Sequence, residues 1–150
     1  MNSKINITFL DFEDAHNILF DILGIDSKMK VMSPDGICHL IKKSNISDPE
    51  LYNQCSQSIM DCSTLNFLDI IMNGIGDEEM VVMITHESYN LEKVFYADWK
   101  NMKDFCDQVY ENLFSGINSF VQEHDYIFLI PKRRKIHIFN HNLGHSVREF

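Results

Sequence analysis

The sequence predicts one α+β domain over residues 1–150, in which two or three helices cover an antiparallel sheet that ends in a C-terminal β-hairpin. Short apolar segments of strand length recur along the chain, and turn residues separate them. One long segment after Asp98 instead repeats its apolar residues every three or four positions, as an amphipathic helix does. No linker, repeat or low-complexity stretch divides the 150 residues, and this length suits a single core.

The N-terminal part predicts a strand, a helix and a hairpin. Alternating apolar residues predict a strand over 4–10. Asp11 then stands where it caps a helix that Gly24 ends. Residues 28–43 predict a hairpin, because two short segments flank a Pro-Asp-Gly turn.

The middle of the chain predicts one further helix and two strands. A capping box begins the segment 47–60, and Pro49 suits the first turn of a helix there. The apolar segment 65–72 fits either a helix or a buried strand. Residues 80–85 and 89–97 predict strands.

The C-terminal part predicts the longest helix and a hairpin. The helix begins at Asp98, and its apolar stripe continues to Val121. Strands over 126–130 and 135–139 flank the short turn 131–134. The first of these strands is apolar throughout, so we expect it to lie in the middle of the sheet.

Composition limits the classes of function. Hydrophobic residues make up 45% and aromatic residues 11% of the chain, which excludes a disordered tail or a linker. The net charge of −9 argues against a chain that wraps nucleic acid or anionic lipid. The charge is also uneven, because residues 1–131 carry −13 and residues 132–150 carry +4.

We expect a cytoplasmic protein without a membrane segment or a disulfide. The longest purely apolar runs, such as residues 80–84, are far shorter than the ~20 residues that a spanning helix needs. Asp11, Glu13 and Asp14 interrupt any signal-peptide core. Without an export signal, the four cysteines are expected to be reduced and largely buried. They are Cys38, Cys55, Cys62 and Cys106.

Three histidines form the one candidate metal site. His137, His141 and His145 are spaced by four residues, so a helix would place three imidazole ligands on one face. Strict alternation around His137 favours a strand instead, and Gly144 weakens a helix. We therefore expect an exposed polar terminus with no metal or other cofactor. A small metal-binding enzyme or sensor is the alternative.

Catalytic motifs are missing from the sequence. It contains no glycine-rich phosphate loop, no GxSxG elbow, no HExxH and no paired CxxC. His86-Glu87 is only a fragment of the HExxH pattern, because no second histidine follows it at the required spacing. Cys106 lies on the apolar stripe and is expected to pack in the core. The sequence thus favours a binding protein over an enzyme.

Six carboxylates are the candidate contacts with a protein partner. Three share one face of the predicted helix after Asp98, and three are consecutive in a predicted loop before residue 80. They are Asp77, Glu78, Glu79, Asp104, Asp107 and Glu111. A solvated helix face is the simpler interpretation of the helical row. A dense acidic surface also attracts a basic partner and imitates the phosphate charge that a nuclease binds.

The turn 132–135 collects four adjacent cations, Lys-Arg-Arg-Lys. Such a cluster can contact phosphate or anionic lipid, but charge at a hairpin tip also protects a sheet edge from unwanted pairing. One short cluster on an acidic chain is weak support for nucleic acid, so we expect no direct contact with it.

The segment 73–110 has a characteristic order of turn, strands and helix. Asn-Gly-Ile-Gly-Asp at 73–77 precedes the strand 80–85, and Val-Phe-Tyr-Ala-Asp at 94–98 leads into a helix with aromatic residues. This order resembles the later half of SUKH-type immunity proteins, in which a Gly-Asp turn precedes two strands and an Ala-Asp-Ser-Phe-like segment begins a helix. Trp99 stands where a serine is usual. The resemblance implies an antitoxin that binds and neutralises a toxin of bacterial competition.

We therefore expect an immunity protein of the kind found in contact-dependent growth inhibition. Its partner would be a cognate protein toxin with a basic nuclease domain, which the acidic surface would occlude without catalysis. An adaptor subunit of a larger complex is a further alternative with the same surface features. The sequence leaves the oligomeric state open.

Overall fold

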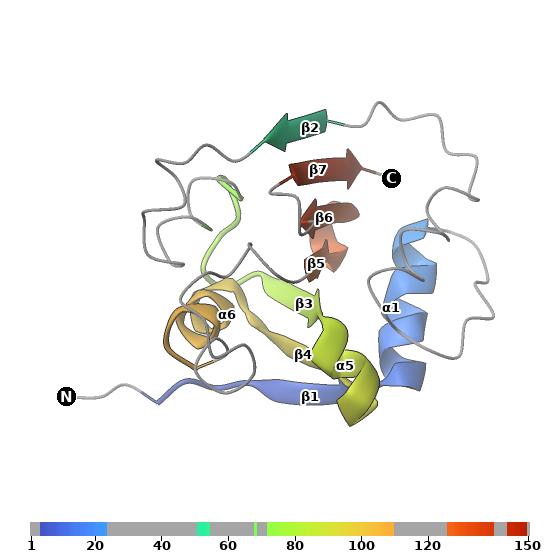
Figure 1. The fold of residues 1–150 in the computed structure, drawn as a ribbon, viewed down its shortest axis with the longest axis vertical. Helices are drawn as coiled ribbons and strands as arrows, with labels where there is room; N and C mark the ends of the chain where they lie inside the picture. Colours follow the sequence, from blue (N-terminus) through green and yellow to red (C-terminus); the bar gives the residue numbers. More distant parts are fainter. Residues whose placement is uncertain are drawn as a thin grey trace.

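Seven antiparallel strands and the helices on both faces of their sheet make up the part of the chain that the structure, a computed structural model, describes. Its described residues are 4–23, 51–54, 68, 72–109, 126–139 and 144–149. The strand order is β1-β4-β3-β5-β6-β7-β2, and every neighbouring pair is antiparallel. Figure 1 shows α1 and α6 on opposite sides of this sheet, with β1 and β2 at its two edges. The α+β class with a helix-covered antiparallel sheet is thus confirmed.

The element bounds match several predicted segments. The strands are β1 (Thr8–Asp11), β2 (Leu51–Gln54), β3 (Met80–Ile84), β4 (Lys93–Asp98), β5 (Tyr126–Ile130), β6 (Lys135–Phe139) and β7 (Gly144–Glu149). The helices are α1 (Phe12–Leu23), α5 (His86–Leu91) and α6 (Trp99–Phe105), together with the 3₁₀ turn η2 (Pro131–Arg133). The strands predicted over 126–130 and 135–139 have the same first and last residues as β5 and β6.

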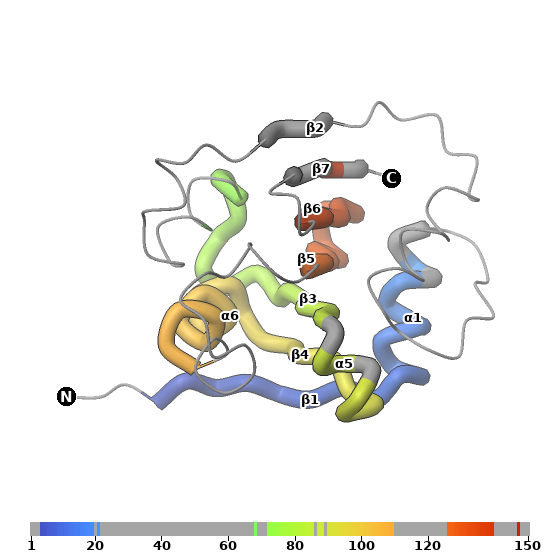
Figure 2. The backbone as a smooth tube through the Cα atoms, viewed as in Figure 1, coloured from blue at the N-terminus to red at the C-terminus, as the bar shows by residue number. Residues whose placement is uncertain are grey.

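Side-chain alternation divides the core between the two faces of the sheet, because successive strand residues point to opposite faces. On one face α6 contributes Trp99 and Met102, and large side chains from β3, β4, β5 and β6 pack with them. On the other face Ala15 and Leu19 of α1 pack against the alternate residues of the same strands. Figure 2 shows the backbone of this arrangement, with the sheet between α1 and α6.

β5 is the central strand, as its apolar sequence predicts. It lies fourth of the seven strands, and its five side chains are all buried. Phe128 packs edge-to-face on both Trp99 and Phe139, with ring centroids 6.2 and 5.7 Å apart. Because helices cover both faces, neither side of β5 needs polar residues.

Two aspartates begin helices where the sequence predicts them. Asp11 Oδ1 accepts a hydrogen bond from the Asp14 N–H at 2.9 Å, and Asp98 Oδ1 accepts one from the Asn101 N–H at 2.8 Å. Each carboxylate satisfies one of the N–H groups that a first helical turn leaves unpaired. After Phe105, residues 106–109 continue α6 as a π-helical turn, and the predicted helix beyond them lies outside the described residues.

Two predicted strands are shorter than expected. The strand expected over 4–10 is assigned only at β1, although Ile5 and Ile7 still pack against the core. The strand expected over 89–97 begins at Lys93, because α5 occupies the chain before it.

Thr85 stands at the start of α5 and makes two hydrogen bonds there. Its Oγ1 accepts from the Glu87 N–H at 3.1 Å, and its own N–H donates to Ser88 Oγ. This cap supplies hydrogen bonds that a strand would have to find in a neighbour.

The helix predicted over 47–60 is wrong at residues 51–54. These residues form β2, which pairs antiparallel with β7 from Leu51↔Val147 to Gln54↔Gly144. Local capping signals favour a helix there, but the four residues instead pair with β7 along the edge of the sheet. The rest of that segment and the predicted hairpin at 28–43 lie outside the described residues.

The segment 65–72 is described only at Leu68 and Met72. Both side chains are buried in the core on the α6 face. The Met72 N–H donates to the Leu68 carbonyl at 2.9 Å, a helical spacing that fits the first of the two predicted alternatives. In the part of the chain that the structure describes, no helix has the length and apolar character to span a membrane.

Candidate functional site

The loop between Met72 and β3, residues 73–79, carries three of the predicted contact residues and is called the acidic loop below. Gly74 has φ +94°, a backbone conformation that glycine adopts readily and other residues adopt only with strain. Within the loop the Gly76 N–H donates to Glu79 Oε2 at 2.6 Å, and the Glu79 N–H donates back to the Gly76 carbonyl at 3.0 Å. The side chain of Glu79 therefore folds back over its own loop.

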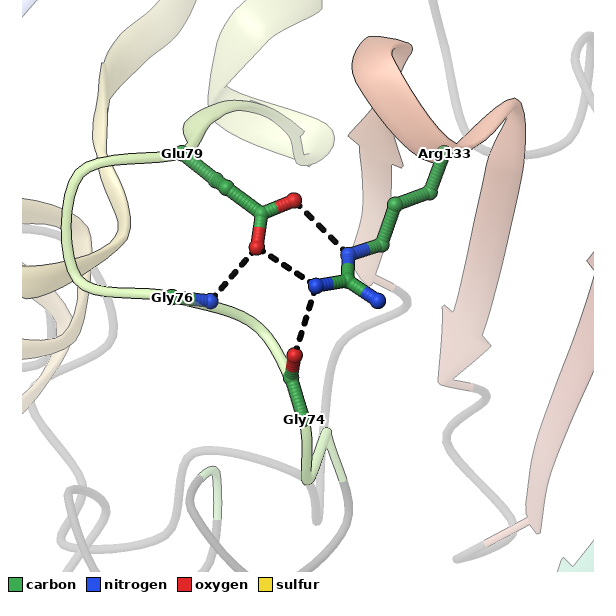
Figure 3. Close-up of polar contacts among 4 residues, drawn as sticks. All are labelled: Gly74, Gly76, Glu79 and Arg133. Carbon is green, nitrogen blue, oxygen red and sulfur yellow. Dashed lines mark hydrogen bonds and ion pairs between the residues drawn. The ribbon is translucent and has the colours of Figure 1, made fainter.

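Arg133, in the turn between β5 and β6, holds the acidic loop from outside (Figure 3). Its Nε donates to Glu79 Oε1 and its Nη2 to Glu79 Oε2, both at 2.7 Å. Nη2 also donates to the Gly74 carbonyl at 2.7 Å. This is the two-pronged geometry in which a guanidinium binds a carboxylate most strongly.

These contacts keep Glu79 ionised. The hydrogen bonds from Arg133 lower the pKa of Glu79 from 4.5 to about 2, against the opposing effect of partial burial, and the Gly76 N–H assists. The same pair raises the pKa of Arg133. Only 10% of the Glu79 side chain is exposed, and both carboxylate oxygens accept hydrogen bonds within the protein. The structure thus gives Glu79 hydrogen bonds within the protein, and its contact with a partner stays a prediction.

The acidic loop also begins α6. The Trp99 N–H donates to the Glu79 carbonyl at 2.8 Å, and the Lys100 N–H donates to the Asp77 carbonyl at 3.1 Å. Together with the Asp98 cap, these bonds satisfy the first turn of the helix. The loop is therefore attached to a helix on one side and to a hairpin turn on the other.

Asp77 and Glu78 are the carboxylates of the acidic loop whose side chains remain exposed to solvent. Both residues are exposed, and 66% of the Asp77 side chain is accessible to solvent. Asp77 Oδ1 lies 3.6 Å from Lys103 Nζ, which in turn lies 5.5 Å from the centre of the Trp99 ring. The Asp77 end of this ion pair is exposed, so Asp77 remains accessible to solvent or a partner.

The predicted helical row is described in part. Asp104, in α6, and Asp107, in the π-helical turn that follows, are both half-buried. Glu111 lies outside the described residues. The acids of the loop and those of the helix therefore lie on neighbouring elements. The ion pair of Asp77 with Lys103 connects the two elements, and Lys103 directly precedes Asp104.

The basic turn lies against the acidic loop, a proximity that no local sequence pattern indicates. Lys132, Arg133 and Arg134 are exposed, and Lys135 is half-buried. Arg134 adopts φ +50° at the end of η2, which lets the chain reverse into β6. The antiparallel pairing of β3 with β5 explains the proximity, because it brings the start of β3 next to the end of β5.

His137, the first of the three histidines, is buried in the sheet. His137 is 4% exposed on β6, where it lies opposite Phe128 on one side and Val147 on the other. His145 belongs to β7 and pairs with Phe139, whereas His141 lies outside the described residues. The expected exposed position is therefore wrong for His137, because β7 extends the sheet beyond the predicted hairpin. Among the described residues, no three His, Cys, Asp or Glu side chains are placed to hold a metal ion together.

Cys106 packs in the core, as its position on the apolar stripe predicts. It is fully buried, and its Sγ lies 3.4 Å from Met83 Sδ as a weak donor. Cys38, Cys55 and Cys62 lie outside the described residues. Burial of this thiol makes it a packing group in the described structure.

The arrangement as a whole presents surface carboxylates on a hydrogen-bonded backbone, which suits electrostatic contact with cations of a partner. No family model, curated protein or solved structure matches the chain.

Proposed function

We propose that this protein is an immunity protein that binds a cognate bacterial toxin and neutralises it without catalysis. The contact surface would consist of the acidic loop, α6 and the π-helical turn after it, with Asp77, Glu78, Asp104 and Asp107 as its described acids. The observation that carries the proposal is the placement of Asp77 and Glu78. Both are exposed on a loop whose backbone is bonded to α6 and to the turn after β5.

Electrostatics supports a basic partner. The chain carries a net charge of −9, and a field of this sign accelerates encounter with a positively charged protein at low ionic strength. A nuclease domain is a suitable target, because its cleft is built to bind the phosphates of a nucleic acid. Carboxylates on a loop whose backbone is fixed by hydrogen bonds can occupy such a cleft in place of phosphates.

The order of elements supports the same class. The acidic loop is followed by β3, by β4 and then by α6, whose cap is Asp98 in the sequence Ala97-Asp98-Trp99. This is the order on which the resemblance to SUKH-type immunity proteins rests, with α5 added between the two strands. A cytoplasmic site of action belongs to this proposal, since an immunity protein acts where its toxin arrives.

Affinity capture from a lysate of the native source tests the proposal. The tagged protein and the variant Asp77→Lys/Glu78→Lys are compared at low and high salt, and the retained proteins are identified by mass spectrometry. We expect one stoichiometric partner with a basic nuclease domain, bound by the parent at low salt and weakly by the variant. The purified partner should lose nuclease activity when the parent is added.

The variant Asp21→Lys is the control for a charge reversal elsewhere on the surface. It makes the same kind of charge change at an exposed acid on α1, the helix on the other face of the sheet. It should retain the partner as the parent does. Equal retention by all three proteins, or a partner whose activity the parent does not inhibit, would argue against the proposal.

A further inference from the structure

The bonds between Arg133 and the acidic loop suggest a role for a residue that belongs to neither acidic segment. We infer that Arg133 is the positioning residue of the proposed contact surface: it holds the acidic loop in the conformation that presents Asp77 and Glu78 to the partner. This inference rests on the proposed function. It assigns to the basic turn a task that its charge alone does not indicate.

Arg133 bonds to two separate points of the acidic loop. One is the Glu79 carboxylate at the end of the loop, and the other is the Gly74 carbonyl near its start, each at 2.7 Å. Glu79 Oε2 in turn accepts from the Gly76 N–H at 2.6 Å. The guanidinium therefore ties together both ends of the segment that contains Asp77 and Glu78 (Figure 3).

The acidic loop needs hydrogen bonds that restrain its backbone, because two of its residues are glycines. Gly74 and Gly76 have more backbone freedom than other residues, and an unrestrained loop would populate many conformations. On the α6 side, two N–H groups of the helix fix the carbonyls of Asp77 and Glu79. Arg133 restrains the side of the loop that the helix does not reach. Between the two attachments, Asp77 and Glu78 remain exposed.

A restrained loop binds more tightly than a flexible loop with the same side chains. If only a fraction of the molecules holds the binding conformation, the apparent affinity falls by that fraction. Losing the tie should therefore weaken partner binding even though Asp77 and Glu78 are still present. This effect distinguishes a positioning residue from a residue that simply contributes charge.

The geometry also predicts that lysine cannot replace Arg133. A guanidinium donates in parallel from Nε and Nη2 and still reaches the Gly74 carbonyl, whereas an ammonium group offers a single nitrogen. Arg133→Lys keeps the positive charge and removes the two-pronged contact. Lys132→Gln, in the same turn, removes a charge and leaves the contact in place.

The first arm of the test needs no partner. Hydrogen exchange of the Gly76 and Glu79 amides is compared in the parent and in Arg133→Lys, Arg133→Gln and Lys132→Gln. We expect both Arg133 variants to exchange about tenfold faster at these amides, which corresponds to losing charge-assisted hydrogen bonds. Amides of β5 and the Lys132→Gln variant should exchange as in the parent. Unchanged exchange in the Arg133 variants would overturn the inference.

The second arm uses as its probe the purified protein that the capture experiment retains. The affinity should fall about tenfold in both Arg133 variants if a tenth of the loops remain in the binding conformation. Lys132→Gln should bind as the parent or slightly tighter, because it removes a positive charge from an acidic contact surface.

The outcomes separate the inference from the proposed function. Faster loop exchange with unchanged affinity, while Asp77→Lys/Glu78→Lys still weakens binding, would leave the proposed function standing and reject Arg133 as its positioning residue. Normal binding by Arg133→Lys and weak binding by Arg133→Gln would also reject it, because charge alone would then suffice. If Asp77→Lys/Glu78→Lys binds normally or no protein is retained, the proposed surface fails and this inference fails with it.

Discussion

Arg133 and Glu79 are 54 residues apart in the sequence, yet two hydrogen bonds of 2.7 Å join their side chains. The pairing of β3 with β5 sets Val82 opposite Leu129, so the loop before β3 meets the turn after β5. The two residues bring together the acidic loop and the basic turn, which the sequence presents as separate features. Several measurable consequences follow from this contact and from the elements around it.

Replacing Arg133 with Gln should lower the free energy of unfolding measurably, because Glu79 loses charge-assisted hydrogen bonds at a partly exposed site. Urea denaturation followed by Trp99 fluorescence measures the change. Trp99 is the one tryptophan of the chain, and its backbone N–H donates a hydrogen bond to the Glu79 carbonyl. Lys132→Gln is the control and should be within about 0.5 kcal/mol of the parent. Equal losses for both variants would contradict a specific contact.

The stability of the parent should fall as the pH is lowered from about 4.5 to about 2. The pKa of Glu79 is lowered from 4.5 to about 2 in the folded protein. Between these values the unfolded chain therefore binds the proton more readily, and protonation favours unfolding. The contribution of Glu79 is complete above about 4.5 and is lost as the pH approaches about 2.

Glu79→Gln provides the comparison for this pH dependence. The variant has no proton to bind at this position, so its free energy of unfolding should change less steeply over the same range. Denaturation at a series of pH values measures both slopes. Identical slopes in parent and variant would show that the carboxyl of Glu79 is not held at a lowered pKa.

Removing the cap of α6 with Asp98→Ala should lower the free energy of unfolding by about 1 kcal/mol. The Asp98 carboxylate accepts from the N–H and from the side chain of Asn101, at 2.8 and 2.9 Å. Asp98→Asn keeps an oxygen acceptor at this position and should retain most of the stability. Thermal denaturation of the two variants separates the cap from the negative charge; a larger loss in Asp98→Asn than in Asp98→Ala would rule out the cap.

Truncating the central aromatic residue with Phe128→Ala should cost about 3–5 kcal/mol of unfolding free energy. Phe128 is fully buried and packs edge-to-face against Trp99 and Phe139. Phe9→Ala serves as the control, since Phe9 is 52% exposed on the edge strand β1. Denaturant titration should show a clearly smaller loss for this variant. Similar losses would place the centre of the core elsewhere.

Reversing the two outer loop charges with Asp77→Lys/Glu78→Lys should slow association with the captured partner about tenfold at low salt, because electrostatic steering is removed. The salt dependence of the association rate should become weaker as well. Stopped-flow mixing measures both quantities, with Asp21→Lys as the control for a charge reversal outside the acidic loop. An unchanged association rate would remove the acidic loop from the interface.

Several elements could be predicted from the sequence because their causes are local. The Asp11 and Asp98 caps depend on residues three positions away, and the hairpin 126–139 depends on its turn and its apolar pattern. The apolar stripe of α6 also located Trp99, Met102 and Cys106 in the core. In each case the signal and the structure that it specifies lie within a few residues.

The candidate site could be predicted only in part. The sequence identified Asp77 and Glu78 as exposed acids, and the structure agrees. The sequence analysis grouped Glu79 with these two residues, because three consecutive acids cannot be told apart without knowing which residues surround each of them in the folded protein. The partner of Glu79 comes from another strand pair, and no pattern near residue 79 points to Arg133.

By itself, the sequence determined the α+β class, the starts of α1 and α6 and the strands β3, β5 and β6, since short-range hydrogen bonds and side-chain periodicity control these features. Only the tertiary structure decided that residues 51–54 form a strand, that His137 is buried, and that Glu79 binds Arg133. The reason is common to all three. Each depends on which strands become neighbours, and β2, β7 and β5 acquire their neighbours from distant parts of the chain.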